Sequence, residues 1–136
     1  MSKPIDYRAL AEFRHQLRIF LSFSETNVRK AGLTSQQYQA LLAVKGWAGP
    51  NSMHVGELAR LLLIKHHTAG ELVARMASRG LVRRTVDPTD NRRVLVTLTK
   101  KGMDRLKKVA GVNFKHLGGA SSAFSKVLKL IARTSG

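Results

Sequence analysis

The sequence predicts a mainly α-helical chain with one small β-hairpin, an α+β winged helix-turn-helix flanked by helices at both ends. Apolar residues recur at helical spacing through most of the chain. Two short helical segments, 55–62 and 67–79, are separated by only a few residues. The next stretch, 81–98, is β-prone on both sides of a group of turn formers. A helix-turn-helix followed directly by a hairpin is the element order of a winged helix.

Length and composition favour one domain over residues 1–136. Apolar residues make up 43% of the chain, which is enough for a core. The chain has no cysteine, which excludes disulfides, thiolate metal sites and thiol-based redox sensing. Residues 1–8 lack the apolar segment of a signal peptide, and the longest aliphatic run, 61–64, is too short to span a membrane. We therefore expect a soluble, cytoplasmic protein with no membrane partner.

The first half of the chain contains two predicted helices. The first runs from about Ile5 to Lys30 and ends at Gly32. Its apolar stripe comprises Leu10, Phe13, Leu17, Phe20, Ser24 and Val28. Thr34 is the expected N-cap of the second helix, with Gln37 as its capping-box partner, and this helix extends to about Trp47. A turn follows at 49–52.

The second half begins with the helix-turn-helix. A short helix at 55–62 is followed by a junction at 63–65 and then by a helix from His67 to Arg79. Gly80 stands just past the last turn, where a left-handed C-cap is favoured. The inner face of the later helix is predicted to consist of Ala69, Leu72, Val73 and Met76.

The hairpin and the C-terminal helices complete the prediction. Strands 81–86 and 93–98 flank a turn at 87–91. Thr99 is expected to cap a helix over 100–117, which Gly118-Gly119 should end. Ser121 or Ser122 then caps a last helix. The terminal helices are left with apolar stripes that need a partner.

The net charge of +16 indicates a polyanionic partner, with nucleic acid as the first choice. Of the 24 basic residues, 17 lie from residue 56 onward, so the second half of the chain carries most of the charge. The amino end of the second helix of a helix-turn-helix reaches base edges in the major groove. Glu71 could accept a hydrogen bond from a cytosine amine or pair with Arg75, and Arg79 is expected on phosphate or an acidic neighbour. The predicted contacts on this helix are Lys65, His66, His67, Thr68, Gly70, Glu71 and Arg75.

The hairpin supplies a second predicted contact surface. An arginine at its tip suits the narrow minor groove, where negative potential is focused, and Arg92 is the expected tip residue. Asp90 would hold the Arg92 guanidinium in one orientation. Basic residues elsewhere on the hairpin are Arg83, Arg84 and Arg93. The predicted DNA-binding set also includes Ser35 and Gln36, at the start of the second helix.

Several of these motifs together resemble the MarR family of bacterial transcription regulators. The resemblance rests on Leu58–Leu62, Arg79–Arg84, the Asp87–Arg92 pattern Asp-Pro-x-Asp-x-Arg, and Leu98–Gly102. It implies a homodimer whose two winged helices bind the half-sites of a pseudo-palindrome in double-stranded DNA. Residues 33–99 would form the DNA-binding region, and residues 5–30 and 100–135 the helical dimerisation region.

The resemblance also implies regulation by a small molecule. Family members commonly repress genes and release DNA when a small phenolic or anionic compound binds, so a small aromatic or anionic effector is expected here. Polar candidates for its pocket are Arg14, Arg18, Tyr38 and His54. The sequence predicts no cofactor.

Other classes of function have less support. No catalytic motif or pair of acid/base residues is present, so an enzyme is not expected. Adjacent His66 and His67 diverge by about 100° on a helix, which argues against a shared metal ion. A non-specific nucleic-acid coat or a ribosome-associated protein explains the charge equally well, although it does not account for the wing motif.

Overall fold

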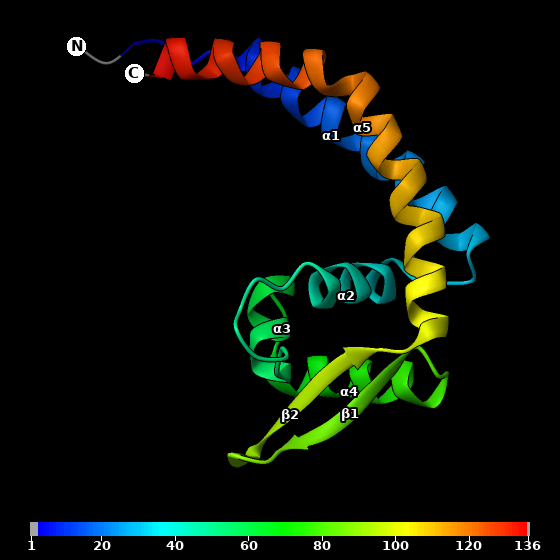
Figure 1. The fold of residues 1–136 in the computed structure, drawn as a ribbon. Coiled ribbons are helices and arrows are strands. Elements are labelled where there is room, and N and C mark those ends of the chain that lie inside the picture. The colour runs from blue at the N-terminus through cyan, green and yellow to red at the C-terminus, as the bar shows by residue number, and fades with distance from the viewer. Residues whose placement is uncertain (1–2, 136) are drawn as a thin grey trace. The chain divides into compact units, whose positions relative to one another are not determined.

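The structure is a computed structural model that describes residues 3–135 and divides into two compact units. The helical unit contains the chain up to Asn27 and from Gly111 onward, and the winged unit contains Val28–Ala110. The predicted fold class is confirmed, since the chain is mostly helical with one antiparallel hairpin (Figure 1). The elements are α1 (Tyr7–Lys30), α2 (Ser35–Lys45), α3 (Val55–Leu62), α4 (His66–Ser78), β1 (Val82–Asp87), β2 (Asp90–Leu98) and α5 (Lys100–Ser135).

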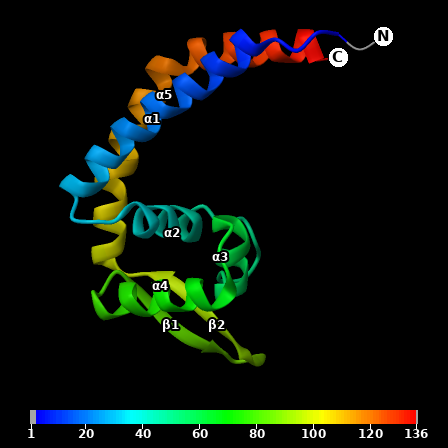
Figure 2. The same ribbon diagram turned by 180° about the vertical axis from the view of Figure 1, so that it is seen from behind.

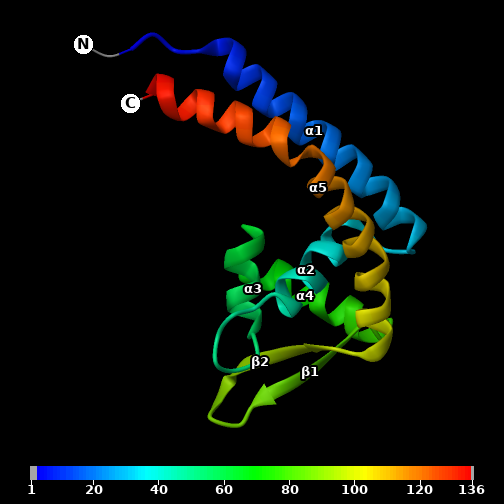
Figure 3. The ribbon, with the colours of Figure 1, turned by 45° about the horizontal axis from the view of Figure 1, so that its top comes forward.

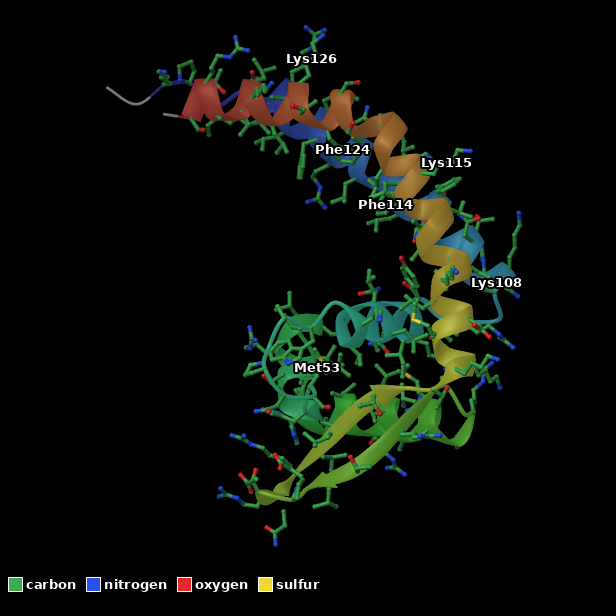
Figure 4. All side chains as sticks on the ribbon, viewed as in Figure 1. Met53, Lys108, Phe114, Lys115, Phe124 and Lys126 are labelled. Carbon is green, nitrogen blue, oxygen red and sulfur yellow. The ribbon has the colours of Figure 1, made fainter. Side chains whose placement is uncertain are left out.

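The winged unit has a continuous apolar core. Leu41 on α2, Leu58 on α3 and Leu106 on α5 are almost completely buried in it. Met53, just before α3, also lies inside this unit (Figure 4). The buried face of α4 is the predicted one, namely Ala69, Leu72, Val73 and Met76. Viewed from behind, α2 and α4 lie on either side of this core, and the hairpin extends beyond them (Figure 2).

Local hydrogen bonds determine where the helices begin and end. The predicted capping box of α2 is confirmed: the Gln37 backbone N–H donates to Thr34 Oγ1 at 3.1 Å, and Gln37 Oε1 accepts from the Thr34 N–H at 3.0 Å. The predicted end of α2 near Trp47 is wrong by two residues, because Gly46 caps the helix. The predicted start of α1 at Ile5 is also early. Asp6 Oδ1 accepts from the Ala9 N–H at 2.9 Å, and the helix begins at Tyr7.

Two glycines adopt the predicted left-handed conformation at helix ends. Gly32 has φ of 73° after α1, and Gly80 has φ of 74° after α4. These backbone angles are accessible to glycine at little cost, because it lacks the Cβ that clashes with the carbonyl. Both predicted helix ends are confirmed.

The hairpin is longer and its turn tighter than predicted. Residues 90–92 belong to β2, which leaves only Pro88 and Thr89 between the strands. The Asp87 carboxylate accepts from both the backbone N–H and the hydroxyl of Thr89, at 2.9 and 2.8 Å, and so closes the turn. At its base the hairpin is tied to the segment before α3, where the Val96 N–H donates to the Met53 carbonyl at 2.9 Å.

The predicted break at Gly118-Gly119, with a separate last helix from Ser121 or Ser122, is wrong. Helix α5 continues without interruption from Lys100 to Ser135. A glycine costs a helix up to about 1 kcal/mol relative to alanine, but it keeps its N–H donor and creates no clash, unlike proline. Two glycines therefore weaken a long helix without ending it when neighbouring turns are held by packing.

Helices α1 and α5 lie side by side in the helical unit (Figure 3). Asn113 Nδ2 donates to Ser24 Oγ at 2.8 Å in a buried contact, and the rings of Phe23 and His116 stack with centroids 4.1 Å apart. Large apolar side chains of this unit are nevertheless exposed: Ile5, Tyr7, Leu10, Ile19, Leu21, Val112, Phe114, Leu117, Leu128 and Leu130. None of the helices formed by residues 3–135 has the length and apolar character that a membrane span requires.

Candidate nucleic-acid interface

The turn between α3 and α4 presents the candidate reading helix. Leu63 ends α3 in the left-handed region, with φ of 57° and ψ of 42°, and its side chain is 91% exposed. The Ile64 N–H donates back to the Ala59 carbonyl at 3.0 Å, which satisfies an end group of α3. A leucine in this conformation costs about 1–2 kcal/mol relative to the right-handed region. The tight turn is therefore held by its hydrogen bonds and not by a glycine.

The first turn of α4 leaves its backbone donors available. The N-cap Lys65 makes no side-chain hydrogen bond to the helix, in contrast to the capping boxes of α2 and α3. Uncapped N–H groups at a helix start carry partial positive charge and favour an anion such as phosphate. Lys65, His66 and His67 are exposed around this end of α4. The geometry suits contact with a nucleic-acid backbone.

Glu71 and Arg75 pair with each other on the outer face of α4. Arg75 Nη2 lies 3.4 Å from Glu71 Oε2, and both side chains are more than half exposed. A pair so exposed contributes well below 1 kcal/mol to stability. Two partners were predicted for Glu71. The pair with Arg75 is present in the free chain. The hydrogen bond from a cytosine amine concerns the DNA-bound state and stays a prediction.

Arg92 is the third residue of β2 and not the tip residue that was expected, since Pro88 and Thr89 form the turn. Asp90 holds it near that turn. Arg92 Nε and Nη2 donate to the two carboxylate oxygens of Asp90 at 3.1 and 3.3 Å, so the predicted contact is present. The Arg92 side chain is still 86% exposed. The side-chain and backbone hydrogen bonds from Arg92 lower the pKa of Asp90. The Asp90 carboxylate is therefore charged at neutral pH, and it is protonated only when the pH falls through this lowered pKa. Asp90 thus holds Arg92 in this orientation at neutral pH.

A cleft of about 250 Å³ brings several predicted residues together. Val55, Val73 and Val94 contribute apolar walls. The predicted DNA-binding residues that line the same cleft come from both α4 and the hairpin: His66, Gly70, Arg84, Arg92 and Arg93. Arg93 Nε also lies 3.5 Å from Asp90 Oδ2. The start of α4 and the arginines of the wing thus form one cationic surface.

Other predicted residues lie apart from this cleft. Arg83 is exposed on β1, one residue before Arg84, and adjacent residues on a strand point to opposite faces. Ser35 and Gln36 are exposed at the start of α2. They precede Gln37, whose Oε1 accepts from Arg79 Nη1 at 3.1 Å. Ser35 and Gln36 therefore lie toward the C-terminal end of α4.

Arg79 lacks the acidic neighbour that was one of the two partners expected for it, and the other, a phosphate, stays a prediction. Its guanidinium donates to the Gln37 side chain and to the Gly32 carbonyl at 3.0 Å, and no acidic group contacts it in the described part of the chain. These bonds tie the end of α4 to the turn after α1. Arg79 is thus a structural residue in the free protein.

The four residues predicted for an effector pocket have different surroundings. Arg14 and Arg18 are exposed on α1 in the helical unit. Tyr38 is buried in the core of the winged unit. His54 is the N-cap of α3 and forms a capping box with Glu57, whose Oε1 lies 3.2 Å from His54 Nε2. The effector pocket stays a prediction.

Sequence reasoning did not identify the capping role of His54. The spacing His54-x-x-Glu57 matches the capping-box pattern with histidine in place of serine or threonine, and that pattern was the available signal. The cap sets the start of α3, while the adjacent residues contact the base of the hairpin.

Comparison with known sequences supports the interpretation of these motifs. Residues 31–93 match the model of the MarR family. The transcriptional activatory protein BadR of Rhodopseudomonas palustris is 40% identical over 75 residues. This match covers 55% of the present chain and 43% of BadR, so the chain spans less than half of that relative.

Solved structures share the fold over most of the chain. AbsC from Streptomyces coelicolor, a MarR family transcriptional regulator, has a TM-score of 0.70 and 23% identity, with 98% of this chain and 97% of AbsC covered. A mutant of Staphylococcus aureus MepR bound to an oligodeoxyribonucleotide has a TM-score of 0.67 and 18% identity, covering 88% and 84%. CouR from Rhodococcus jostii, bound to p-coumaroyl-CoA, has a TM-score of 0.67 and 21% identity, covering 85% and 80%. The chain therefore contains a MarR family domain, which the family model matches at residues 31–93, and it shares the winged-helix fold of these structures.

Proposed function

We propose that this protein is a sequence-specific regulator of transcription that binds double-stranded DNA. The observation that carries the proposal is the cleft at which the start of α4 and the wing arginines meet, with Arg92 exposed and held by Asp90. The major groove admits a helix such as α4, and an arginine suits a narrow minor groove. The MepR structure, which contains an oligodeoxyribonucleotide, supports the assignment by similarity of fold.

The functional unit in this proposal is a homodimer formed by the helical unit. The supporting observation is the series of exposed apolar side chains on α1 and α5, including Tyr7 at 73% and Phe114 at 83% exposure. Exposed apolar patches of this kind mark interaction surfaces. Two copies would place two winged units on the half-sites of a pseudo-palindrome, about one helical turn of DNA apart.

The dimer has a direct test. We expect light scattering at micromolar concentration to give twice the chain mass of 15.0 kDa. Phe114→Glu should shift the mass toward the monomer, because it places a charge at an apolar contact. Leu63→Glu introduces the same change at an exposed leucine of the winged unit and serves as the control. A monomer mass for the unmodified chain would contradict the proposed dimer.

The DNA-binding proposal is tested by selection of bound sequences from a random duplex pool. We expect the recovered sequence to bind roughly 10³-fold or more tightly than random DNA at the same salt concentration. The logarithm of the binding constant should fall with the logarithm of salt concentration, with a slope of about −0.9 for each phosphate neutralised. A ratio near one would favour the non-specific coat, and a flat salt dependence would contradict the electrostatic surface.

Regulation completes the proposal. We infer that binding blocks a promoter, and that a small aromatic or anionic effector releases the DNA. The structure of CouR with p-coumaroyl-CoA shows that a protein of this fold can hold an organic anion. The proposal includes no catalytic step and no cofactor.

A further inference from the structure

Many cations of the winged unit lie away from the reading end of α4. They surround the C-terminal end of that helix, the end of α1 and the start of α5. We call this set the basic corner: Arg29, Lys30, Arg79, Lys100, Lys101, Arg105 and Lys108. Residues 29–32, at the end of α1, contain no acidic residue, and residues 100–108, at the start of α5, contain only Asp104. Among the residues that the structure describes, no ion pair involves a cation of the basic corner.

Three of these cations hold the corner together. Arg79 Nη2 donates to the Gly32 carbonyl at 3.0 Å, and Arg105 Nη1 donates to the neighbouring Ala31 carbonyl at 2.8 Å. Lys101 Nζ donates to the Arg79 carbonyl at 2.8 Å. Cations interact favourably with the carbonyl groups at the negative ends of helices. These three side chains are therefore stabilised without an acidic partner. The hydrogen bonds bring the ends of α1 and α4 to the start of α5.

The remaining four cations have no such structural role. Lys30 precedes Ala31, Lys100 precedes Lys101, and Lys108 lies about one turn after Arg105. These lysines and Arg29 are exposed, and their side chains have no hydrogen-bond or ionic partner in the described part of the chain. The rigid arrangement therefore holds several unneutralised charges close together at a solvent-facing surface, and such a surface favours a polyanion.

We propose that the basic corner binds phosphates of the same DNA duplex outside the half-site that α4 and the wing contact. This inference rests on the proposed DNA-binding function. Helix α4 has 13 residues and is about 20 Å long, which equals about six base-pair steps of duplex. The corner thus lies far enough from the reading end to contact flanking phosphates. It also gives a role to Ser35 and Gln36, which start α2 at the same end of α4.

The test compares two charge-matched triple variants. The corner variant combines Lys30→Gln, Lys100→Gln and Lys108→Gln. The control combines Lys115→Gln, Lys126→Gln and Lys129→Gln on the exposed surface of the helical unit. In Figure 4 the labelled side chains of Lys108, Lys115 and Lys126 point away from α5. Both variants lose three charges. Circular dichroism checks that both remain folded, and light scattering checks that both keep the mass of the unmodified protein, because Lys126 and Lys129 border apolar side chains of the proposed dimer surface.

Each protein is titrated on two duplexes that carry the selected sequence at their centre, one of about 20 and one of about 40 base pairs. The measured quantity is the salt slope, the slope of the logarithm of the binding constant against the logarithm of salt concentration. On the long duplex we expect its magnitude to be smaller for the corner variant by up to about 2.7, which is about 0.9 for each lost phosphate contact. On the short duplex its slope should match that of the control. The control should keep the slope of the unmodified protein on both.

Three results would overturn the inference. In the first, the salt slope of the corner variant decreases no more than that of the control. In the second, it decreases equally on both duplexes, which would place the corner inside the half-site. In the third, the corner variant binds single-stranded RNA more weakly than the unmodified protein but keeps its affinity for duplex DNA, which would assign the corner to RNA. If selection recovers no preferred sequence, the proposed function fails separately, and the slopes are then compared on random duplexes of the same lengths.

Discussion

Arg92→Ala is expected to weaken binding to the selected duplex by ~1–3 kcal/mol, which corresponds to about a 5- to 150-fold rise in Kd. The physical reason is the loss of a guanidinium that Asp90 already holds in an exposed position. Because the side chain is ordered before binding, little rotamer entropy is lost on docking. Fluorescence anisotropy at one fixed salt concentration measures the change.

The control for Arg92→Ala is Arg133→Ala, which removes one positive charge from the exposed end of α5. It should leave Kd within about twofold, because Arg133 belongs to the helical unit and is not among the predicted DNA contacts. Asp90→Asn should cause a smaller loss than Arg92→Ala, because the guanidinium remains but is less well oriented. An Arg92→Ala variant with the affinity of the Arg133→Ala control would refute the role assigned to the wing.

Gly102→Ala is expected to destabilise the winged unit by about 2–3 kcal/mol. A Cβ at Gly102 would clash with the Leu81 carbonyl oxygen and would lie 3.4 Å from Leu41 Cδ2. The first atom belongs to the backbone at the junction of α4 and β1, so it has no rotamer by which to move away. Overpacking of this kind costs about 1–3 kcal/mol, and the better helix propensity of alanine offsets only part of it. Urea unfolding followed by Trp47 fluorescence measures the change.

Gly118→Ala is the matched control within the same helix. Its Cβ would have no neighbour within 4 Å, and α5 is continuous through this position. We expect stabilisation of up to about 1 kcal/mol from helix propensity. Both variants are compared at one protein concentration, since the proposed dimer would make apparent stability depend on concentration. Destabilisation by Gly118→Ala equal to that of Gly102→Ala would show that α5 is interrupted at Gly118.

Local signals explain most of the agreement between the predicted and observed fold. Thr34 and Gln37 are three residues apart, so their capping box depends only on neighbouring backbone. Gly32 and Gly80 likewise mark helix ends through their own backbone freedom. The pattern of apolar residues on α4 specified which face would be buried, because burial repeats with the helical period.

The errors arose where local propensity competed with longer-range interactions. Gly118-Gly119 has a low helix propensity, yet the helix continues, since propensity is a weak preference that packing and helix continuity override. The acidic neighbour expected for Arg79 is absent from the described part of the chain, because its guanidinium donates to Gly32 and Gln37, which lie more than 40 residues earlier. No spacing rule connects residues so far apart.

The sequence by itself determined the fold class, the positions of α4 and the hairpin, and the Asp90–Arg92 pair, because each depends on a period or a short spacing. Only the tertiary structure showed that α4 and the wing share one cleft, that the start of α5 has no room for a side chain at Gly102, and that cations from three elements meet at the basic corner. Such features depend on distances between segments that are far apart in the chain. Their positions follow from how the whole core packs, and local patterns do not encode them.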